Sequence, residues 1–537
     1  MKHLCKCLPV GALLLALTLP TYSLAADEDI HQKIDALQKE LDALKKKTEQ
    51  VEKKTELVEK KTDQVEKKSL GRWLEISGDY RFRFDSLRGE VPSFYNMQDP
   101  TFVGWLLGQM NGAPPAPPPG PALGFKVKND TLYTNRFGLN LKAKATKDVS
   151  VTARLLMYKA AGAENDAAIT GSGVGPFFAD RAGTFDGTIG HVPGDNKLAV
   201  DRVYATWNNI ADQPLWFSIG RRPSTGGVPS HLRQDTEKPG NSGVPALLVD
   251  YAFDGVTIGY APDIDALPGA YTKLCYGRGF QNSITKTEGN GLRNTDMFGI
   301  NLVPYETDAL RAELQYNRGF NIFNSPVMLT GPFAGTGPSV DLGDIDWFGL
   351  DFIGKVKNVG IGSINWFVDG ALSITRPNDN FSFPFAGMAP NTPGAGLLYN
   401  QGQAKKDKTG WAVYLGGRYD IEATGTKLGF EYNHGSRDWI TFAPAADDMW
   451  TSKVGTRGNV YEGYVIQELP LKPISSYVSK AFFKVGYQYY DFNYTGSNNW
   501  VGAPVKISEL TATPNNAQFF TPLKTAQDLY VTFEVHF

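Results

Sequence analysis

Long segments in which apolar and polar residues alternate constrain the fold of this chain more than any other feature. The first covers residues 74–84 and reads LEISGDYRFRF, with apolar side chains in one phase and charged or small polar ones in the other. The last covers residues 529–537, reads LYVTFEVHF and ends on Phe537. A period of two is typical of β-strands with one apolar and one polar face. The sequence therefore predicts an all-β fold for residues 71–537.

Three properties of these segments favour a membrane barrel over a soluble sandwich. In a sandwich the apolar faces form a shared core, whereas in a membrane barrel they face lipid. The segments are about ten or more residues long, as a tilted membrane-spanning strand requires. Their polar phase carries full charges, and aromatic residues gather near their ends, at Phe84, Tyr133, Trp207, Phe217, Trp411 and Tyr419. Such interfacial aromatic girdles are typical of transmembrane barrels.

Sixteen candidate strands follow one another along the chain. They cover residues 74–84, 131–145, 149–158, 198–208, 215–221, 246–260, 270–278, 295–304, 309–318, 344–356, 360–375, 409–419, 425–434, 458–467, 479–492 and 527–537. The connectors between them are alternately long and short, as are the outer loops and inner turns of membrane barrels with an even number of strands. The sequence therefore predicts an antiparallel transmembrane β-barrel of about 16 strands, within a range of roughly 14–18.

One position in this series has two interpretations. Asp254-Gly255 has the sequence of a type I′ hairpin turn, and the alternation slips phase there. A glycine-containing bulge within one strand produces the same slip. We expect the bulge, within a single strand over 246–260, and the hairpin is the alternative.

The first 26 residues have the pattern of a secretory signal peptide. A basic start is followed by an apolar run over residues 8–19 and by small residues at 23–26, where cleavage is expected. The run is too short to span a bilayer, so an uncleaved anchor is the less favoured alternative. Cleavage leaves Cys275 as the one cysteine of an exported chain, which predicts no internal disulfide and no cysteine-based metal site.

Residues 27–70 have a seven-residue repeat, with three visible copies, TEQVEKK, TELVEKK and TDQVEKK. Such a stripe predicts a coiled-coil helix, because a lone helix cannot bury it. Its core positions, and so the expected oligomerisation residues, are Ile34, Leu37, Leu41, Leu44, Val51, Val58 and Val65. Lysines at g, five residues before glutamates at e, favour parallel helices, and the β-branched later layers favour three strands. A solvated, charged spacer helix is the alternative.

Together these features resemble bacterial outer-membrane porins and, more narrowly, porin-like proteins with a short coiled coil before the barrel. The resemblance rests on the signal peptide, the heptad helix, the alternating strands and the final strand, 529–537. It implies a location in the outer membrane, in contact with its lipid, with the helix in the periplasm. It also implies passive passage of small solutes, often as a homotrimer, and recognition of the last strand, with Phe533 and Phe537, by the outer-membrane assembly machinery. It brings no catalytic residues and no cofactors.

The polar phase of the strands supplies the expected lining of the pore. The candidates are Arg81, Arg83, Arg136, Lys142, Lys144, Arg154, Arg202, Arg311, Glu313, Asp369, Arg418 and Glu431. The basic residues of the first four strands form one positive wall, and the acidic candidates are fewer. A wall of one sign selects ions of the opposite sign, which predicts a weak anion preference. If the arginines instead pair with acids across the lumen, little selectivity is expected.

The first long connector, 85–130, is the candidate for a segment that folds into the lumen. Asp99 and Pro100 can begin a short helix that carries apolar residues. Phe102 and Trp105 on this helix are therefore expected at a constriction. An outer cap or a subunit contact is the alternative for this connector.

Composition and motifs argue against other classes of function. The 54 basic and 56 acidic residues lack the basic excess of a nucleic-acid-binding protein. No HExxH, P-loop, GxSxG or CxxCH motif is present, so neither an enzyme nor a metal site is predicted. Two alternatives to a diffusion channel stay open: a barrel that sheathes a partner, such as a multihaem electron conduit, and a rim hydrolase that uses His434 and Ser436.

Overall fold

The computed structural model describes residues 39, 45–47, 73–160, 197–222, 224–238, 245–282, 292–324, 339–382, 394–400, 402–443, 447–471 and 479–537. The chain divides into two units, Met1–Arg72 and Trp73–Phe537. In the first unit, Lys39 and residues 45–47 are helical. The expected signal peptide and the heptad core positions lie outside the described residues, so both stay predictions.

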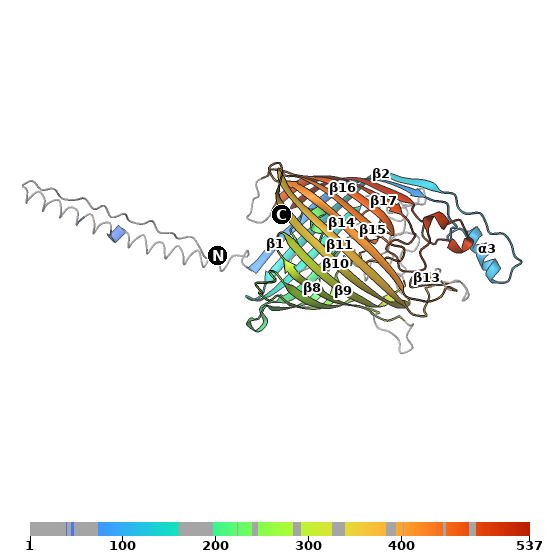
Figure 1. Ribbon diagram of the computed structural model, residues 1–537, viewed down its shortest axis with the longest axis horizontal. Coiled ribbons are helices and arrows are strands. Elements are labelled where there is room, and N and C mark those ends of the chain that lie inside the picture. Colours follow the sequence, from blue (N-terminus) through green and yellow to red (C-terminus); the bar gives the residue numbers. More distant parts are fainter. Residues whose placement is uncertain are drawn as a thin grey trace, which may run out of the picture. The chain divides into compact units, whose positions relative to one another are not determined.

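The second unit is a closed barrel of sixteen antiparallel strands (Figure 1). In chain order they are β1 (Leu74–Val91), β2 (Phe125–Lys144), β3 (Val149–Ala160), β4 (Lys197–Trp207), β5 (Leu215–Arg222), β6 (Phe253–Tyr260), β7 (Tyr271–Phe280), β8 (Thr295–Glu306), β9 (Leu310–Phe323), β10 (Asp341–Val359), β11 (Gly362–Pro377), β14 (Lys408–Ile421), β15 (Thr426–Gly435), β16 (Gly458–Glu468), β17 (Lys480–Phe492) and β18 (Thr525–His536). Neighbours in this order pair, and β1 pairs with β18 to close the barrel. The predicted fold class and strand number are confirmed.

The other described elements lie mainly in the connectors. They are the α-helices α3 (Pro100–Met110) and α5 (Ser230–Gln234), the 3₁₀ turns η1 (Ile210–Asp212), η2 (Lys453–Gly455), η3 (Ile507–Glu509) and η4 (Pro514–Asn516), and a small sheet of β12 (Ala395–Gly396) and β13 (Tyr399–Asn400). Among the described residues, no helix is both long and apolar enough to cross a membrane.

Long and short connectors lie at opposite ends of the barrel. Short ones include 145–148, 307–309 and 360–361, whereas long ones include 92–124 and 493–524. Because neighbouring strands are antiparallel, this alternation defines a short-connector end and a long-connector end. In transmembrane barrels these ends correspond to the periplasmic turns and the outer loops.

The strand expected over residues 246–260 begins only at Phe253. Asp254 lies inside β6, opposite Arg221 of β5 and Arg278 of β7, so Asp254-Gly255 is not a hairpin turn. The expected bulged strand is also wrong. The apolar residues before Phe253 leave the barrel wall and are buried in the interior core instead.

The two faces of the barrel wall have opposite character. Large apolar side chains such as Ile76 and Ile219 are about half exposed on the outside. Side chains in the other phase, such as Arg81, Arg136 and Glu313, are buried inside the barrel. An apolar outside and a polar inside are the arrangement of a transmembrane barrel.

The largest cluster of buried apolar side chains also lies inside the barrel. It combines inward wall residues such as Trp347 with connector residues such as Leu248, Tyr251 and Phe442. Connectors that fold inward therefore share the interior with the charged face of the wall.

Candidate functional site in the barrel lumen

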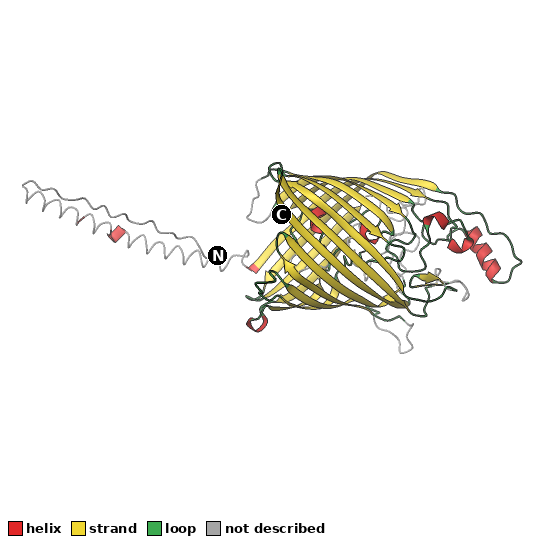
Figure 2. Ribbon diagram, viewed as in Figure 1, coloured by secondary structure: helices red, strands yellow, loops and turns green. Residues whose placement is uncertain are grey.

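Two long connectors enter the barrel, and we call them the lumen loops. The β5–β6 loop is described at 224–238 and 245–252, and the β15–β16 loop at 436–443 and 447–457. Figure 2 shows short helical segments, in red, within the outline of the strands. The β5–β6 loop reaches the short-connector end, because the Lys238 ammonium lies 2.6 Å from the carboxylate of Glu306, the last residue of β8.

The lumen loops are joined to each other by main-chain hydrogen bonds. The Asp250 amide donates to the Phe442 carbonyl at 3.1 Å, and the Phe442 amide donates to the Leu248 carbonyl at 2.9 Å. The Thr441 hydroxyl donates to the Leu247 carbonyl at 2.6 Å. The rings of Tyr251 and Phe442 meet edge to face, 5.6 Å apart. The two loops therefore form one packed body across the lumen.

Asp235 anchors the β5–β6 loop to the wall formed by β14, β15 and β17. Its carboxylate lies 3.0 Å from Arg418, 2.6 Å from Lys427 and 2.7 Å from Lys480. Burial alone would raise the pKa of Asp235, but Lys480, Lys427 and Arg418 outweigh it and hold the pKa below its usual range. The carboxylate is therefore ionised at neutral pH.

A second ionic cluster joins both lumen loops to β15 and β16. Arg233 of α5 lies 2.7 Å from Asp448 in the other lumen loop and 3.1 Å from Glu462 on β16. Lys453 lies 2.6 Å from Glu462 and also contacts Glu431 on β15. Cations and carboxylates alternate in this cluster, so each buried charge has an opposite neighbour.

Asp447 anchors the β15–β16 loop to the adjacent part of the wall, at β1 to β3. Its carboxylate lies 3.3 Å from Arg81 and 2.7 Å from Arg136, and it accepts a hydrogen bond from the Tyr158 hydroxyl. This wall contains the basic residues for which the sequence predicts an anion-attracting face. The carboxylate of Asp447, in the β15–β16 loop, neutralises part of the positive charge of these residues.

The other arginines of this wall are also paired with carboxylates. Arg83 contacts Asp85 (2.5 Å) and Asp528 (2.7 Å), Arg154 contacts Asp79 (2.5 Å), and Arg202 contacts Asp201 (3.2 Å). The pairing reduces the positive field that these residues project into the lumen, so any anion preference from this wall is weaker than their number suggests.

The strand register places the predicted pore-lining residues in the inward phase. On β9, β11, β14 and β15 these are Arg311, Glu313, Asp369, Arg418 and Glu431, all buried. Lys142 and Lys144 are exposed at the short-connector end of β2. Arg311 lies 2.6 Å from Glu313 on the same strand, and Arg418 lies 2.7 Å from Asp420.

The expected constriction at Phe102 and Trp105 is wrong. Figure 1 shows α3 beyond the long-connector end of the strands, so its residues do not narrow the lumen. Phe102 packs against Tyr95, and the Trp105 indole donates to the Ala116 carbonyl at 2.9 Å, both within the same connector. The connector also bonds to the last long connector, where the Met97 amide donates to the Gln518 carbonyl at 2.9 Å.

The inward course of the lumen loops is not among the sequence predictions, although each loop carries a signal for it. The run Ala246-Leu247-Leu248-Val249 is apolar without alternation, and Trp439, Ile440 and Phe442 are large apolar residues in a long connector. Runs of this kind are unusual in solvated loops and indicate burial. A buried strand has the same pattern as the first run, so the sequence alone does not distinguish a strand of the wall from a buried loop there.

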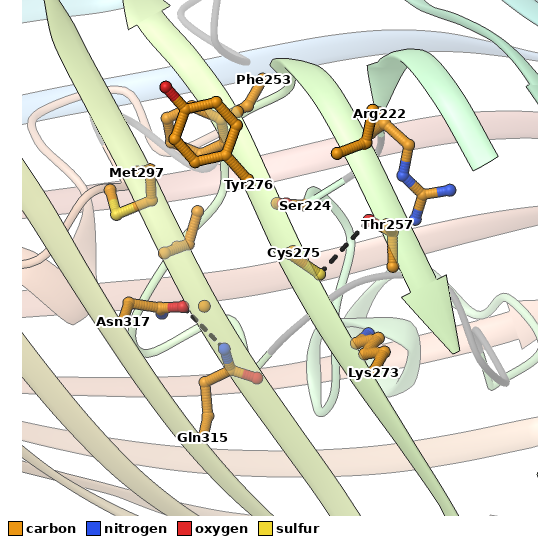
Figure 3. A pocket seen from close by; sticks show the side chains of 14 residues that line it. Arg222, Ser224, Phe253, Thr257, Lys273, Cys275, Tyr276, Met297, Gln315 and Asn317 are labelled. Atoms are coloured by element: carbon orange, nitrogen blue, oxygen red, sulfur yellow. Dashed lines mark hydrogen bonds between the residues drawn. The ribbon is translucent and has the colours of Figure 1, made fainter. Parts of the chain in front are cut away.

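A pocket lies between the β5–β6 loop and the wall formed by β5 to β9 (Figure 3). It has about 520 Å³ of empty volume, part of it open to solvent. Arg222 and Lys273 supply positive charge, and Val249, Phe253 and Met297 supply an apolar side. The pocket therefore has a positive side and an apolar side.

The candidate hydrolase residues at the rim have other partners. The His434 ring nitrogen Nδ1 lies 2.8 Å from the Asn459 amide oxygen, and the Ser436 hydroxyl accepts from the Trp411 amide at 2.8 Å. These contacts do not form a nucleophile–base pair. Over the described ranges, no group of three or more His, Cys, Asp or Glu residues is arranged to hold a metal ion.

Comparison with known proteins gives a family and a set of structural neighbours. No curated protein matches the chain. Among solved structures, OmpT of Vibrio cholerae is similar at 12% identity, over 86% of this chain and 97% of that chain, with a TM-score of 0.37. Pseudomonas putida OprB is similar at 9% identity, over 87% of this chain and 95% of that chain, with a TM-score of 0.38. A double mutant of a Rh. blastica porin is similar at 11% identity, over 86% of this chain and 99% of that chain, with a TM-score of 0.33.

A family model described as "Protein of unknown function (DUF3373)" matches residues 126–537. The match begins in β2 and runs to the end of the chain, so it includes both lumen loops and fifteen of the sixteen barrel strands. The chain therefore belongs to the DUF3373 family of proteins of unknown function.

Proposed function

We propose that this protein is an outer-membrane channel through which small hydrophilic solutes diffuse passively. The observation that carries the proposal is the closed sixteen-stranded barrel with an apolar outside and a charged inside. A barrel of that strand number encloses a lumen wide enough for water and solutes. The ionised side chains that line it replace part of the hydration that a polar solute loses on entry.

The lumen loops form the constriction of this channel. The β5–β6 loop crosses the lumen from its own strands to the wall at β14 to β17, where Asp235 is held, and the β15–β16 loop is held at β1 to β3 through Asp447. A partner threaded through the barrel would need the volume that these loops occupy, which favours a channel over a sheath. Solutes pass beside the loops, where the pocket lined by Arg222 and Lys273 holds open volume.

The proposal includes a weak preference for anions. The paired arginines of β1 to β4 contribute little, so the preference rests on the pocket wall, where Arg222 and Lys273 lie. Reversal potentials in a salt gradient measure it, and a clear cation preference would contradict it.

The proposed assembly is a homotrimer with a parallel coiled coil of residues 27–70 in the periplasm. The last strand is the proposed signal for the outer-membrane assembly machinery. In support, Phe537 exchanges main-chain hydrogen bonds with Gly78 of β1 (2.6 and 2.9 Å), and its ring stacks on Phe137 of β2. The chain end thus lies at the seam that closes the barrel.

Conductance of the purified protein in planar lipid bilayers tests the channel. We expect stepwise, ohmic insertions in potassium chloride. A correctly folded barrel that passes no current would refute the proposed function and favour the sheath or the hydrolase.

A further inference from the structure

The pocket beside the β5–β6 loop contains a buried cation whose environment differs from that of the other lumen arginines. Arg83, Arg233, Arg311 and Arg418 each contact a carboxylate. Arg222 is 8% exposed, and in the described part of the chain no carboxylate forms an ion pair with it. One guanidinium nitrogen donates to the Ser218 hydroxyl, and Nε has no hydrogen-bond partner.

The aromatic surroundings of Arg222 hold its guanidinium without neutralising it. The guanidinium carbon lies 5.3 Å from the centre of the Tyr204 ring and 5.6 Å from that of Trp216. Cation–π contacts of this kind fix the position of the group and leave its positive charge intact. A buried, positioned guanidinium is the side chain that best recognises a carboxylate.

Further polar groups line the same pocket. Lys273 on β7 is 2% exposed and adds a second cation. In Figure 3 the hydrogen-bonded pair Thr257 and Cys275 lies between Arg222 and Lys273, and the pair Gln315 and Asn317 lies to one side. The amide nitrogen of Asn317 is buried and has no hydrogen-bond partner, so it can donate to a ligand.

The remaining lining is apolar. Val249 from the lumen loop, Phe253 at the start of β6 and Met297 on β8 face the same space. A simple inorganic anion would leave these apolar side chains in contact with water, whereas an organic acid with an apolar body would cover them. The combination of an available guanidinium, a second cation and an apolar side therefore selects a class of solute.

We propose that this pocket is a binding subsite for small organic carboxylates on the route through the lumen. The carboxylate binds at Arg222, with Lys273 and Asn317 beside it, and the apolar body lies against Phe253 and Met297. The subsite deepens the proposed channel function and rests on it for access from solvent.

Cys275 makes occupancy of the pocket measurable. Its thiol lines the pocket, and it is the free cysteine of the described chain. In folded protein in detergent, we expect saturating benzoate to slow modification of Cys275 by a water-soluble methanethiosulfonate at least fivefold, as followed by mass spectrometry. An anionic reagent should also react faster than a cationic one, relative to their rates with a free thiol.

Arg222→Met should raise the benzoate concentration needed for half-maximal protection of Cys275 at least tenfold. The matched control is Arg221→Met, the next residue, which pairs with Asp254 at 2.7 Å and lies in the other phase of β5. It removes the same charge outside the pocket and should leave protection unchanged. Calorimetric titration of wild-type protein with benzoate gives a second readout that depends neither on thiol reactivity nor on the folding of a variant.

The two proposals fail in different ways. Chloride conductance without benzoate protection or heat of binding would overturn the subsite and leave the channel standing. Benzoate binding without conductance would overturn the channel and keep the pocket as a binding site. Equal protection in wild type and in Arg222→Met would overturn the assignment of Arg222.

Discussion

Replacing Asp235 by asparagine should detach the β5–β6 loop from the barrel wall. The carboxylate is 2% exposed and contacts Arg418, Lys427 and Lys480 at 2.6–3.0 Å. Asparagine keeps the shape of the side chain and removes its charge, so three cations lose a partner at once. Removing one partner of a buried ion pair costs about 3–5 kcal/mol.

Other carboxylates reduce that cost. Arg418 keeps Asp420 at 2.7 Å, and Lys427 keeps Glu468 at 2.7 Å. We therefore expect a loss of about 1–3 kcal/mol in the free energy that holds the loop in place, close to that of one hydrogen bond to a charged group. This corresponds to roughly a 5–150-fold larger population of the detached loop.

Single-channel recording at neutral pH tests this expectation. Asp235→Asn should show higher or more frequent large conductance levels than wild type, because a detached loop leaves more of the lumen to water. Glu468→Gln is the control, since Glu468 contacts Lys427 and Lys480 without being part of a lumen loop. If folded Asp235→Asn channels have the conductance levels of wild type, the anchoring role of Asp235 is refuted.

Acidification is expected to loosen the same loop through His231 of α5. Burial and neighbouring cations lower the pKa of His231 to about 3. Below about pH 6.5, His231 binds a proton when the loop is detached but not when the loop is inserted. The free energy that favours the inserted loop therefore falls by up to about 1.4 kcal/mol per pH unit. Conductance should rise from about pH 6.5 to 4.5 in wild type and stay constant in His231→Gln, because Asp235, whose pKa lies below its usual range, stays ionised there. Trp105→Ala should leave single-channel conductance unchanged, because α3 lies beyond the strands; an altered conductance would place α3 in the current path. The double variant Val51→Asp, Val58→Asp should convert trimers into monomers by mass measurement in detergent, and a trimer that survives would leave the helix as a spacer.

The barrel could be predicted because each strand carries its own signal. The alternation in residues 74–84 indicates a two-faced strand without knowledge of its neighbours. It also indicates which residues point inward, and the register places Arg81 and Arg136 there. The structure extends β1 to Val91, past the segment with the clearest alternation, because pairing with β2 and β18 continues.

The lumen loops could not be predicted in the same way, since what holds them is distant in the sequence. Asp447 is placed by Arg81, 366 residues away, and Arg233 by Asp448, 215 residues away. No local pattern encodes such pairs. The helix at Asp99 and Pro100 forms as its capping residues indicate, but capping does not determine which way a connector folds.

The hydrogen bonds between the two lumen loops have a consequence for the order in which the protein assembles. They connect Thr441 with Leu247, which is 194 residues away in the sequence. They therefore cannot form until strands from both halves of the barrel stand opposite each other. The contact of Asp447 with Arg81 further requires the wall that contains the closing seam. Contacts between distant segments are slow to form because the chain between them must first be ordered. A newly closed barrel should therefore be wider inside than the finished one, and its permeability should fall with time as the interior settles.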